Sequence, residues 1–216
     1  MEAFVIHYTP LVDRKAHITQ ELTREGITPV FIEKYDREHL TETDIARFIL
    51  SHKLRIGTVS LFLKQVEAWR RIASGSKEFG IIFEDDAVLT PGFVATLETY
   101  MKELPTDYDI LMINEGCNFH IPAELIVADK HVYLRGVHPT TWGGNGGTRC
   151  LDGYILSKKC ASKFVEIFDS RTEKSISLEV DWWMNVVMRA ISANVYWAEP
   201  SIVKQGSEVG LFKSSH

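Results

Sequence analysis

The feature that most constrains the fold of this chain is a short apolar run that ends in three consecutive carboxylates, within residues 79–91 (FGIIFEDDAVLTP). Residues 80–83 form a continuous apolar run, which is typical of a strand buried on both faces. Glu84, Asp85 and Asp86 follow at once. A buried strand that delivers acids to its carboxyl end places them where open α/β sheets bind ligands. The sequence therefore predicts an α/β protein with an acidic ligand site.

Three adjacent carboxylates repel one another, so their proximity is costly unless a cation neutralises them. Glu84 and Asp86 are two residues apart and would leave an extended chain on the same side, so we expect them to share one metal ion, with Asp85 pointing the other way. Thr90 and Pro91 match the N-cap and first residue of a helix. Acids are also favoured just before a helix, so a solvated turn explains the same residues. Both interpretations stay open here.

Composition excludes several classes of protein. The 216 residues suffice for one sizeable domain or two small ones, and 45% apolar with 25% charged residues is typical of a soluble globular protein. A net charge of −5 argues against a nucleic-acid partner. The three cysteines form no CxxC pair, which fits a reducing compartment. No secretion signal and no membrane-spanning run is found, so we expect a cytoplasmic protein without a transmembrane segment.

The first half of the chain alternates strands and helices. The expected elements are strand 3–6, helix 13–25 with Ala16, Ile18 and Leu22 inward, strand 29–35, helix 58–73 capped by Thr58, strand 80–83, helix 91–104 and strand 109–114. Residues 36–57 are polar and weakly periodic. The opening strand–helix–strand unit implies a right-handed connection and a parallel sheet. Trp69 lies on the apolar face of helix 58–73, so we interpret it as a core residue.

The second half changes in character near residue 117. The expected elements are a hairpin at 124–137 around Asp129 and Lys130, strand 154–156, a helix capped by Ser157, helix 179–193, strand 194–197 and a polar tail at 199–216. No linker separates the halves. We therefore predict a single domain, 1–216, with a nucleotide half at about 1–116 and an acceptor half at about 117–216.

A glycine-rich stretch at 140–153 (TTWGGNGGTRCLDG) is the second unusual segment. Five of its fourteen residues are glycine, which permits positive φ or a close backbone approach. It lacks the Lys-Ser/Thr ending of a P-loop, and no strand–glycine–helix unit surrounds it. A structural loop and a ligand-binding loop both remain open.

Four sequence blocks resemble glycosyltransferase family 25, which includes bacterial lipooligosaccharide and procollagen galactosyltransferases. The blocks are IIFEDDAVLTPGF, GTRCLDGYILSKKCA, EVDWWM and AEPSIVKQGSEVGLFKSS, and the opening VIHYTPLVDRK and the stretch VEAWRRIA also resemble the family. The resemblance covers nearly the whole chain, in order. It departs at His7, where an Asn is expected, and at Gln65, where relatives often carry a His. These two positions bear on the choice of donor.

The resemblance implies a GT-A type fold, a Rossmann-like nucleotide-binding half joined to a mixed-sheet acceptor half. It implies metal-dependent, inverting transfer of a sugar, galactose or a related hexose, from a UDP-sugar to a hydroxyl of a glycan, lipooligosaccharide or protein acceptor. Glu84 and Asp86 would hold Mn²⁺ or Mg²⁺. The residues expected to bind the nucleotide sugar are His7, Tyr8, Arg14, Asp85 and Asp152.

The chemistry of the residues agrees with that reaction. A hard divalent cation stabilises the charge that develops on a diphosphate leaving group, and phosphate oxygens and waters complete its coordination. Inversion requires one general base for the acceptor hydroxyl. Asp152, Glu179 and Asp181 are the candidates, and Asp181 is preferred because it matches the acid of the EVDWWM block. Rigid placement in the first turn of a helix and a lowered pKa near the helix N-terminus would make it a modest base.

Two alternatives are weighed, one of them another kind of enzyme and the other from a different functional class. A phosphotransfer domain also places acids after a parallel strand, but it needs a phosphoacceptor Asp and a Lys at later strand ends, where this chain has Asn114 and Glu115. A catalytically inactive nucleotide-sugar-binding or assembly protein would keep metal and UDP binding without transfer. The tail from Gln205 to Ser215 is interpreted as a cover over the donor or as a frayed terminus.

Overall fold

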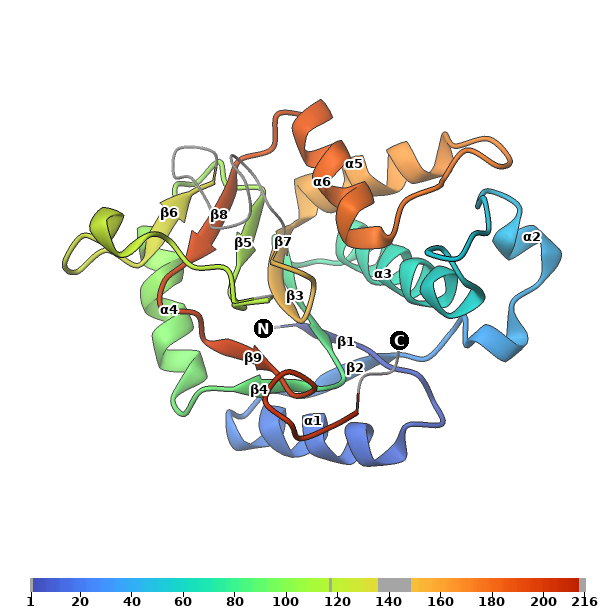
Figure 1. Cartoon of the computed structure of the whole chain (residues 1–216). Helices are drawn as coiled ribbons and strands as arrows, with labels where there is room; N and C mark the ends of the chain where they lie inside the picture. Colours follow the sequence, from blue (N-terminus) through green and yellow to red (C-terminus); the bar gives the residue numbers. More distant parts are fainter. Residues whose placement is uncertain (1, 117, 136–148, 214–216) are drawn as a thin grey trace.

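The computed structural model describes residues 2–116, 118–135 and 149–213 (Figure 1). Within these residues the main sheet has seven strands in the order β2-β1-β3-β7-β5-β8-β6, and a second sheet pairs β4 with β9. The strands are β1 (Ala3–Ile6), β2 (Pro29–Ile32), β3 (Phe79–Glu84), β4 (Ala87–Leu89), β5 (Ile110–Met112), β6 (Val132–Leu134), β7 (Gly153–Ser157), β8 (Val195–Ala198) and β9 (Val203–Gln205).

The main sheet is mixed. β2, β1 and β3 run parallel, as the opening strand–helix–strand unit predicted. β7 runs antiparallel to both β3 and β5, and β6 runs antiparallel to β8, while β5 and β8 are parallel. The predicted fold class is therefore confirmed: a Rossmann-like first half continues into a mixed-sheet second half.

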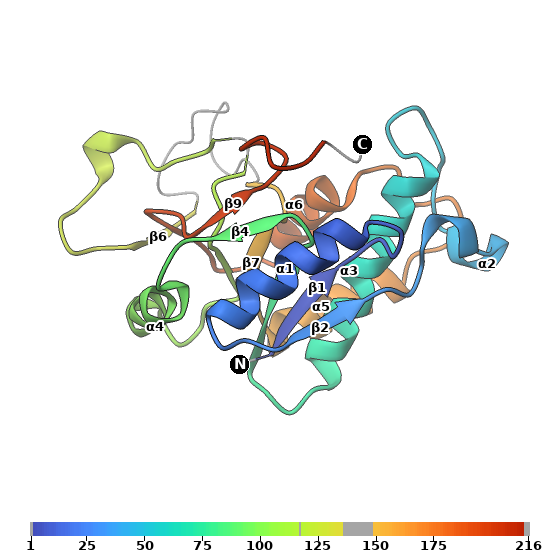
Figure 2. The same ribbon diagram turned by 90° about the horizontal axis from the view of Figure 1, so that it is seen from below.

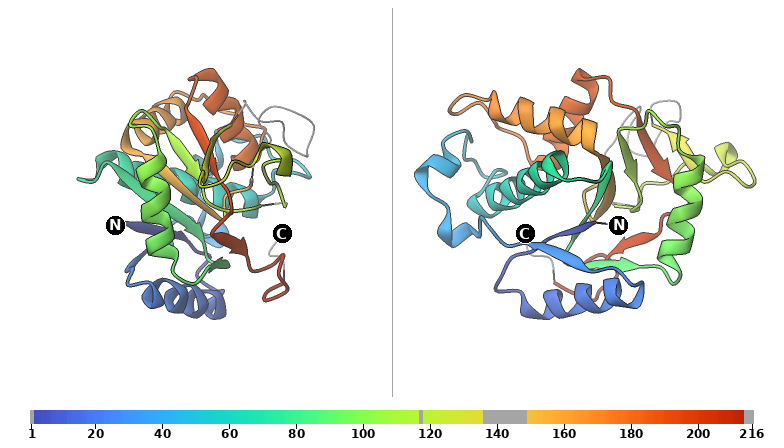
Figure 3. Two further views of the ribbon diagram at one scale, coloured as in Figure 1. Left: turned by 90° about the vertical axis from the view of Figure 1, so that its left-hand side faces the viewer. Right: turned by 180° about the vertical axis from the view of Figure 1, so that it is seen from behind.

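Helices cover both faces of the sheet (Figures 1 and 3). They are α1 (Val12–Arg24), α2 (Glu42–Ile45), α3 (Ile56–Ser74), α4 (Phe93–Glu103), α5 (Lys158–Asp169) and α6 (Val180–Ala190), with short 3₁₀ turns η1 (Arg37–His39) and η2 (Ala123–Leu125). On β3, Ile82 packs with the helices α3, α5 and α6, whereas Ile81 and Phe83 pack with α1 and α4. This alternation confirms that the apolar run before the acids is buried on both faces.

The helix α3 is the centre of one of the two cores. Trp69 is fully buried, stacks on Trp183 of α6 with ring centroids 5.8 Å apart, and donates a hydrogen bond of 2.9 Å to the Tyr154 hydroxyl. The interpretation of Trp69 as a core residue is confirmed. The predicted cap of the next helix is confirmed as well, because the Ser157 hydroxyl accepts a hydrogen bond from the Cys160 amide at the start of α5.

The segment after the acids differs from its prediction. Residues 87–89 form the strand β4, which pairs with β9 near the end of the chain. The helix α4 consequently begins at Phe93, preceded by Gly92 at φ 73°, so the predicted roles of Thr90 and Pro91 at a helix start are wrong. Residues 203–205 are part of a sheet, so this part of the tail is not a frayed terminus.

Three smaller predictions are also wrong. No hairpin forms around Asp129 in the described residues, because β6 pairs with the distant strand β8 and not with its sequence neighbour. Ala16 is exposed on α1, while Ile18 and Leu22 are buried as expected. The helix α3 begins at Ile56, so Thr58 lies inside it and does not cap it. Most of the glycine-rich stretch 140–153 lies outside the described residues.

A search of the described ranges finds no helix with the length and apolar character needed to cross a membrane.

Candidate active site

The acidic motif lies at the carboxyl edge of the parallel strands. β3 ends at Glu84, whose register partner on β1 is Ile6, so the residues after β1 and β3 emerge side by side. Asp85 and Asp86 form a turn that leads into β4. Because they lie in a turn and not in an extended strand, the argument that alternation sends Glu84 and Asp86 to one side does not apply. Their proximity rests on the contacts described below.

Asp85 is enclosed by groups that neutralise it. It is only 5% exposed, with one oxygen 2.8 Å from His7 Nδ1 and the other accepting a 3.1 Å hydrogen bond from the Arg14 guanidinium. The Tyr8 amide donates to the same carboxylate at 3.4 Å. The structure thus brings together four of the five residues expected to bind the donor. Their role in binding remains a prediction.

Asp86 is held by the tail of the chain. The Ser207 amide donates a 3.3 Å hydrogen bond to one Asp86 oxygen, and Arg14 Nη1 lies 3.5 Å from the same oxygen. The Gly206 amide donates to the Asp86 carbonyl at 2.8 Å. A Cβ at position 206 would lie 2.6 Å from that carbonyl oxygen, so this approach requires glycine. The other carboxylate oxygen, Oδ1, is buried and has no hydrogen-bond partner in the described residues.

Asp152 enters the site from the antiparallel strand next to β3. It precedes β7, and its carbonyl accepts a 3.2 Å hydrogen bond from the Glu84 amide. Its side chain is fully buried, with one oxygen accepting from the Asn114 amide group at 2.8 Å and the other, Oδ1, without a partner in the described residues. Burial raises the pKa of Asp152 to about 7, although the Asn114 hydrogen bond opposes the shift.

Glu84 lies at the centre of the acids. Burial raises the pKa of Glu84 well above its usual range, and the charges of four other carboxylates raise it further: Asp86, Asp152, Asp85 and Asp181, in decreasing order. Asp181 comes from the first turn of α6, where its carboxylate accepts a 2.8 Å hydrogen bond from the Trp182 amide. Acids from three separate parts of the sequence, residues 84–86, Asp152 and Asp181, therefore converge at one edge of the sheet.

No group of three or more His, Cys, Asp and Glu side chains arranged to hold a metal ion occurs in the described residues. The site nevertheless has features that suit a divalent cation. Asp86 offers a buried oxygen that has no hydrogen-bond partner among the described residues, and Glu84 is a carboxyl whose ionisation is opposed by its acidic neighbours. A cation would relieve both costs, and hard oxygen ligands are what Mg²⁺ and Mn²⁺ prefer. The residues present fit a cation that takes further ligands from a diphosphate.

Asn114 and Gln65 were not among the residues predicted to form the site. Asn114, two residues after β5, orients Asp152 and also donates to the Arg149 carbonyl. Polar residues at the end of a buried strand were the signal that could have identified it. Gln65 is fully buried on α3 and accepts a 2.7 Å hydrogen bond from Tyr154, whose pKa is raised in part by the charge of Glu84. The position noted as a departure from the family thus contacts Tyr154, a residue on which the charge of Glu84 acts.

The class of the protein follows from comparison with known sequences. Residues 1–184 match the sequence profile of "Glycosyltransferase family 25 (LPS biosynthesis protein)". The match covers most of the chain, so the protein belongs to this family and is a glycosyltransferase. The predicted family is confirmed, and the mixed sheet with its acid-bearing edge is the GT-A type fold expected for it. No curated protein matches the chain.

Solved structures with a similar arrangement are distant in sequence. One is a mutant of Drosophila β1,4-galactosyltransferase 7 in complex with manganese, UDP-Gal and xylobiose, with a TM-score of 0.42, 11% identity, and 94% of this chain and 69% of that chain covered. Another is the inositol-1-phosphate CTP transferase of T. maritima, with a TM-score of 0.41, 14% identity, and coverage of 95% and 70%. HddC of Yersinia pseudotuberculosis with GMP-PN has a TM-score of 0.39, 16% identity, and coverage of 84% and 85%.

Proposed function

We propose that this glycosyltransferase is metal-dependent and inverting, and that it moves galactose or a related hexose from a UDP-sugar to a hydroxyl of a glycan, lipooligosaccharide or protein acceptor. The observation that carries the proposal is the convergence of Asp85, Asp86, Asp152 and Asp181 on Glu84. Such a concentration of negative charge is costly without a cation, and a sugar diphosphate is a ligand that brings one.

Each acid has a proposed role. Glu84 and Asp86 hold Mn²⁺ or Mg²⁺, which when bound supplies Lewis-acid stabilisation of the diphosphate leaving group. Asp152, fixed by Asn114, accepts a hydrogen bond from a hydroxyl of the donor sugar through Oδ1, which has no partner in the described part of the chain. Asp181 accepts the proton of the acceptor hydroxyl as it attacks, and α6 fixes its position.

The remaining donor-binding residues lie on the first strand and helix. Arg14 places its guanidinium beside Asp85 and Asp86 and donates to the Lys213 carbonyl, so it carries positive charge to the edge where a diphosphate would lie. Tyr8 follows β1 with its ring under the Arg37 guanidinium, 4.4 Å from the ring centroid. We propose that His7, Tyr8, Arg14 and Asp85 shape the nucleotide side of the site.

The decisive experiment measures UDP binding by calorimetry and thermal shift, with and without Mn²⁺. The parent chain should bind UDP only when Mn²⁺ is present. Asp86→Ala should lose this Mn²⁺-dependent UDP binding while keeping the fold of the apo protein. Glu98→Ala is the matched control, because Glu98 is an exposed carboxylate on α4. If Asp86→Ala binds UDP as tightly as the parent and with the same need for Mn²⁺, the metal assignment is wrong.

The same material separates the second candidate function, a nucleotide-sugar-binding or assembly protein without catalysis. A screen of UDP-sugars with Mn²⁺ would then show binding, with neither transfer nor slow hydrolysis of any donor. Release of UDP from one donor in preference to the others, dependent on Asp181, supports the transferase.

A further inference from the structure

A loop between α2 and α3 exposes apolar side chains among cations. We propose that residues 47–56 (RFILSHKLRI), together with Leu178, form a surface that docks on an anionic lipid bilayer, and we call these residues the docking loop. Ile49, Leu50 and Ile56 are 45%, 49% and 39% exposed, and Leu178 is 40% exposed. Leu178 belongs to the same surface, because the Ile49 amide donates a 2.7 Å hydrogen bond to the carbonyl of Ile176, two residues before it.

The exposed side chains are presented by a rigid base. Phe48 and Leu54 of the loop are buried, and Phe48 packs edge-on against Phe62 of α3 with centroids 5.2 Å apart. The Ser51 hydroxyl accepts hydrogen bonds from the Lys53 and Leu54 amides, at 3.3 and 3.0 Å, which closes the tip of the loop. The buried residues and hydrogen bonds of the loop therefore hold Ile49 and Leu50 at the surface, so the exposure of these two side chains is a feature of the folded structure.

The charge of the docking loop complements an anionic surface. The chain as a whole has a net charge of −5, yet residues 45–66 contain no Asp or Glu. Arg47, Lys53 and Arg55 supply three cations, and within the described ranges none of them lies within ion-pair distance of a carboxylate. The adjoining residues 170–178 add Arg171 and Lys174 against Glu173. Basic residues interleaved with exposed aliphatic ones are the pattern of an interfacial anchor.

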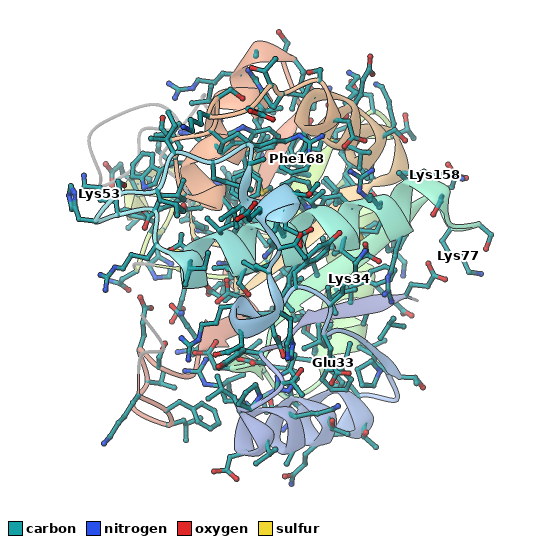
Figure 4. All side chains as sticks on the ribbon, turned by 90° about the vertical axis from the view of Figure 1, so that its right-hand side faces the viewer. Glu33, Lys34, Lys53, Lys77, Lys158 and Phe168 are labelled. Atoms are coloured by element: carbon teal, nitrogen blue, oxygen red, sulfur yellow. The ribbon has the colours of Figure 1, made fainter. Side chains whose placement is uncertain are left out.

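The docking loop faces the same way as the candidate active site. Figure 2 shows the chain between α2 and α3 projecting on the side where the tail after β9 lies, and Figure 4 places Lys53 at one edge of the molecule with Lys77 at the opposite edge. Leu178 is three residues before Asp181. Contact with a bilayer through the docking loop would bring the mouth of the site to a membrane-anchored acceptor. A soluble acceptor would give this surface no role.

The experiment measures co-sedimentation of the full chain with phosphatidylcholine vesicles, with and without about 30 mol% phosphatidylglycerol, at about 50 and about 500 mM salt. The chain should bind only the anionic vesicles and be released at high salt. Each cation near such a surface contributes about fivefold in affinity, so Lys53→Glu/Arg55→Glu should weaken binding at least tenfold. Ile49→Ser/Leu50→Ser should weaken it roughly fivefold or more, because the apolar side chains no longer insert.

The matched control is Lys77→Glu/Lys159→Glu, which removes the same charge from two exposed lysines away from the docking loop and should leave binding unchanged. Near-ultraviolet circular dichroism verifies that each variant is folded. Equal loss in the control, equal binding to neutral vesicles, or no binding at all would overturn the proposal. So would concentration-dependent self-association that Leu50→Ser abolishes, because a second copy would then cover the surface. No nucleotide sugar is involved, so failure here leaves the proposed transferase activity untouched.

Discussion

Asp85 and Asp152 are both buried carboxylates in one site, but they differ in the groups that surround their oxygens. Both oxygens of Asp85 have a basic partner within 3.1 Å, His7 or Arg14. Asp152 has one amide partner, one oxygen without any in the described residues, and a pKa raised to about 7. The fold supplies the neutralising charge on the side of β1 and α1. On the side of β7, Asp152 has no basic partner in the described residues, and we expect a ligand to supply that charge.

The difference separates stability from function. A neutralised buried carboxylate fastens elements together, here the ends of β1 and β3 to α1, and its loss should appear as unfolding. A carboxylate without a counter-charge costs free energy in the empty protein and recovers it when a cation or sugar binds. Variants on the two sides should therefore differ in the kind of defect they show.

The largest effect is expected at Asp181, in the first turn of α6. Asp181→Asn preserves shape but removes the proposed base, and should lower kcat by roughly 10²–10⁴ with donor binding nearly unchanged. Steady-state kinetics with the UDP-sugar found in the donor screen measures this. Glu179→Gln, two residues earlier and outside α6, is the control and should stay near parental kcat. A variant at 181 retaining more than about a tenth of kcat removes Asp181 from this role.

Next in size is the loss of the counter-charge on the neutralised side. Arg14→Met keeps the length and apolar stem of the side chain but leaves Asp85 and Asp86 without their guanidinium, and should cost about 3–5 kcal/mol of unfolding free energy. Urea denaturation measures it. Arg24→Met is the control, because Arg24 pairs with Glu21 at a half-exposed position where a pair contributes at most about 1 kcal/mol. Equal losses of unfolding free energy in the two variants would mean that the ion pairs around Asp85 stabilise the fold no more than an ordinary half-exposed pair does.

A third prediction concerns pH. The pKa of Asp152 is about 7 in the folded protein against about 3.9 unfolded, so the folded state holds the proton longer. Stability therefore falls as pH rises from about 4 to about 7, by roughly 2–4 kcal/mol for this group. Asp152→Asn should be more stable than the parent at pH 8, with the difference vanishing near pH 4.

Asp85→Asn should show the opposite sign at pH 8, because it removes a charge that has two basic partners. Urea titrations of both variants across pH 4 to 8, the window set by the two pKa values of Asp152, test the comparison directly. Two variants shifted in the same direction at pH 8 would contradict it.

Features of the structure that depend on residues close together in the sequence were predicted, and features that depend on residues far apart in the sequence were not. The run 80–83, the cap at Ser157 and the core position of Trp69 are set by local pattern, and each was predicted. β4, β9 and β6 were missed or misassigned because each pairs with a strand far away in sequence. The acidic residues of the site were predicted from the sequence blocks that carry them. The contrast between Asp85, which has two basic partners, and Asp152 was not predicted, because it depends on the register of β1 against β3 and on α1.

The smallest effect is expected in the tail, which touches the neutralised side. Phe212 lies edge-on to the His17 ring at 5.2 Å and under the Arg14 guanidinium at 5.3 Å, and the Lys213 carbonyl accepts a 2.8 Å hydrogen bond from Arg14. Together with the Gly206 and Ser207 amides on Asp86, these contacts place the tail beside the residues proposed to bind the diphosphate. We expect it to order over the bound donor.

Deleting residues 206–216 keeps β9 and should raise the donor KM by about tenfold, because the tail no longer positions Asp86 and Arg14. Phe212→Ala should raise it severalfold, in line with the loss of about 1 kcal/mol of cation–π and ring contact. Leu211→Ala is the control, because Leu211 is 57% exposed, and should leave the KM unchanged. A deletion with parental KM and kcat would show that the tail only fastens the neutralised side, and that donor binding depends on the acids and Arg14 alone.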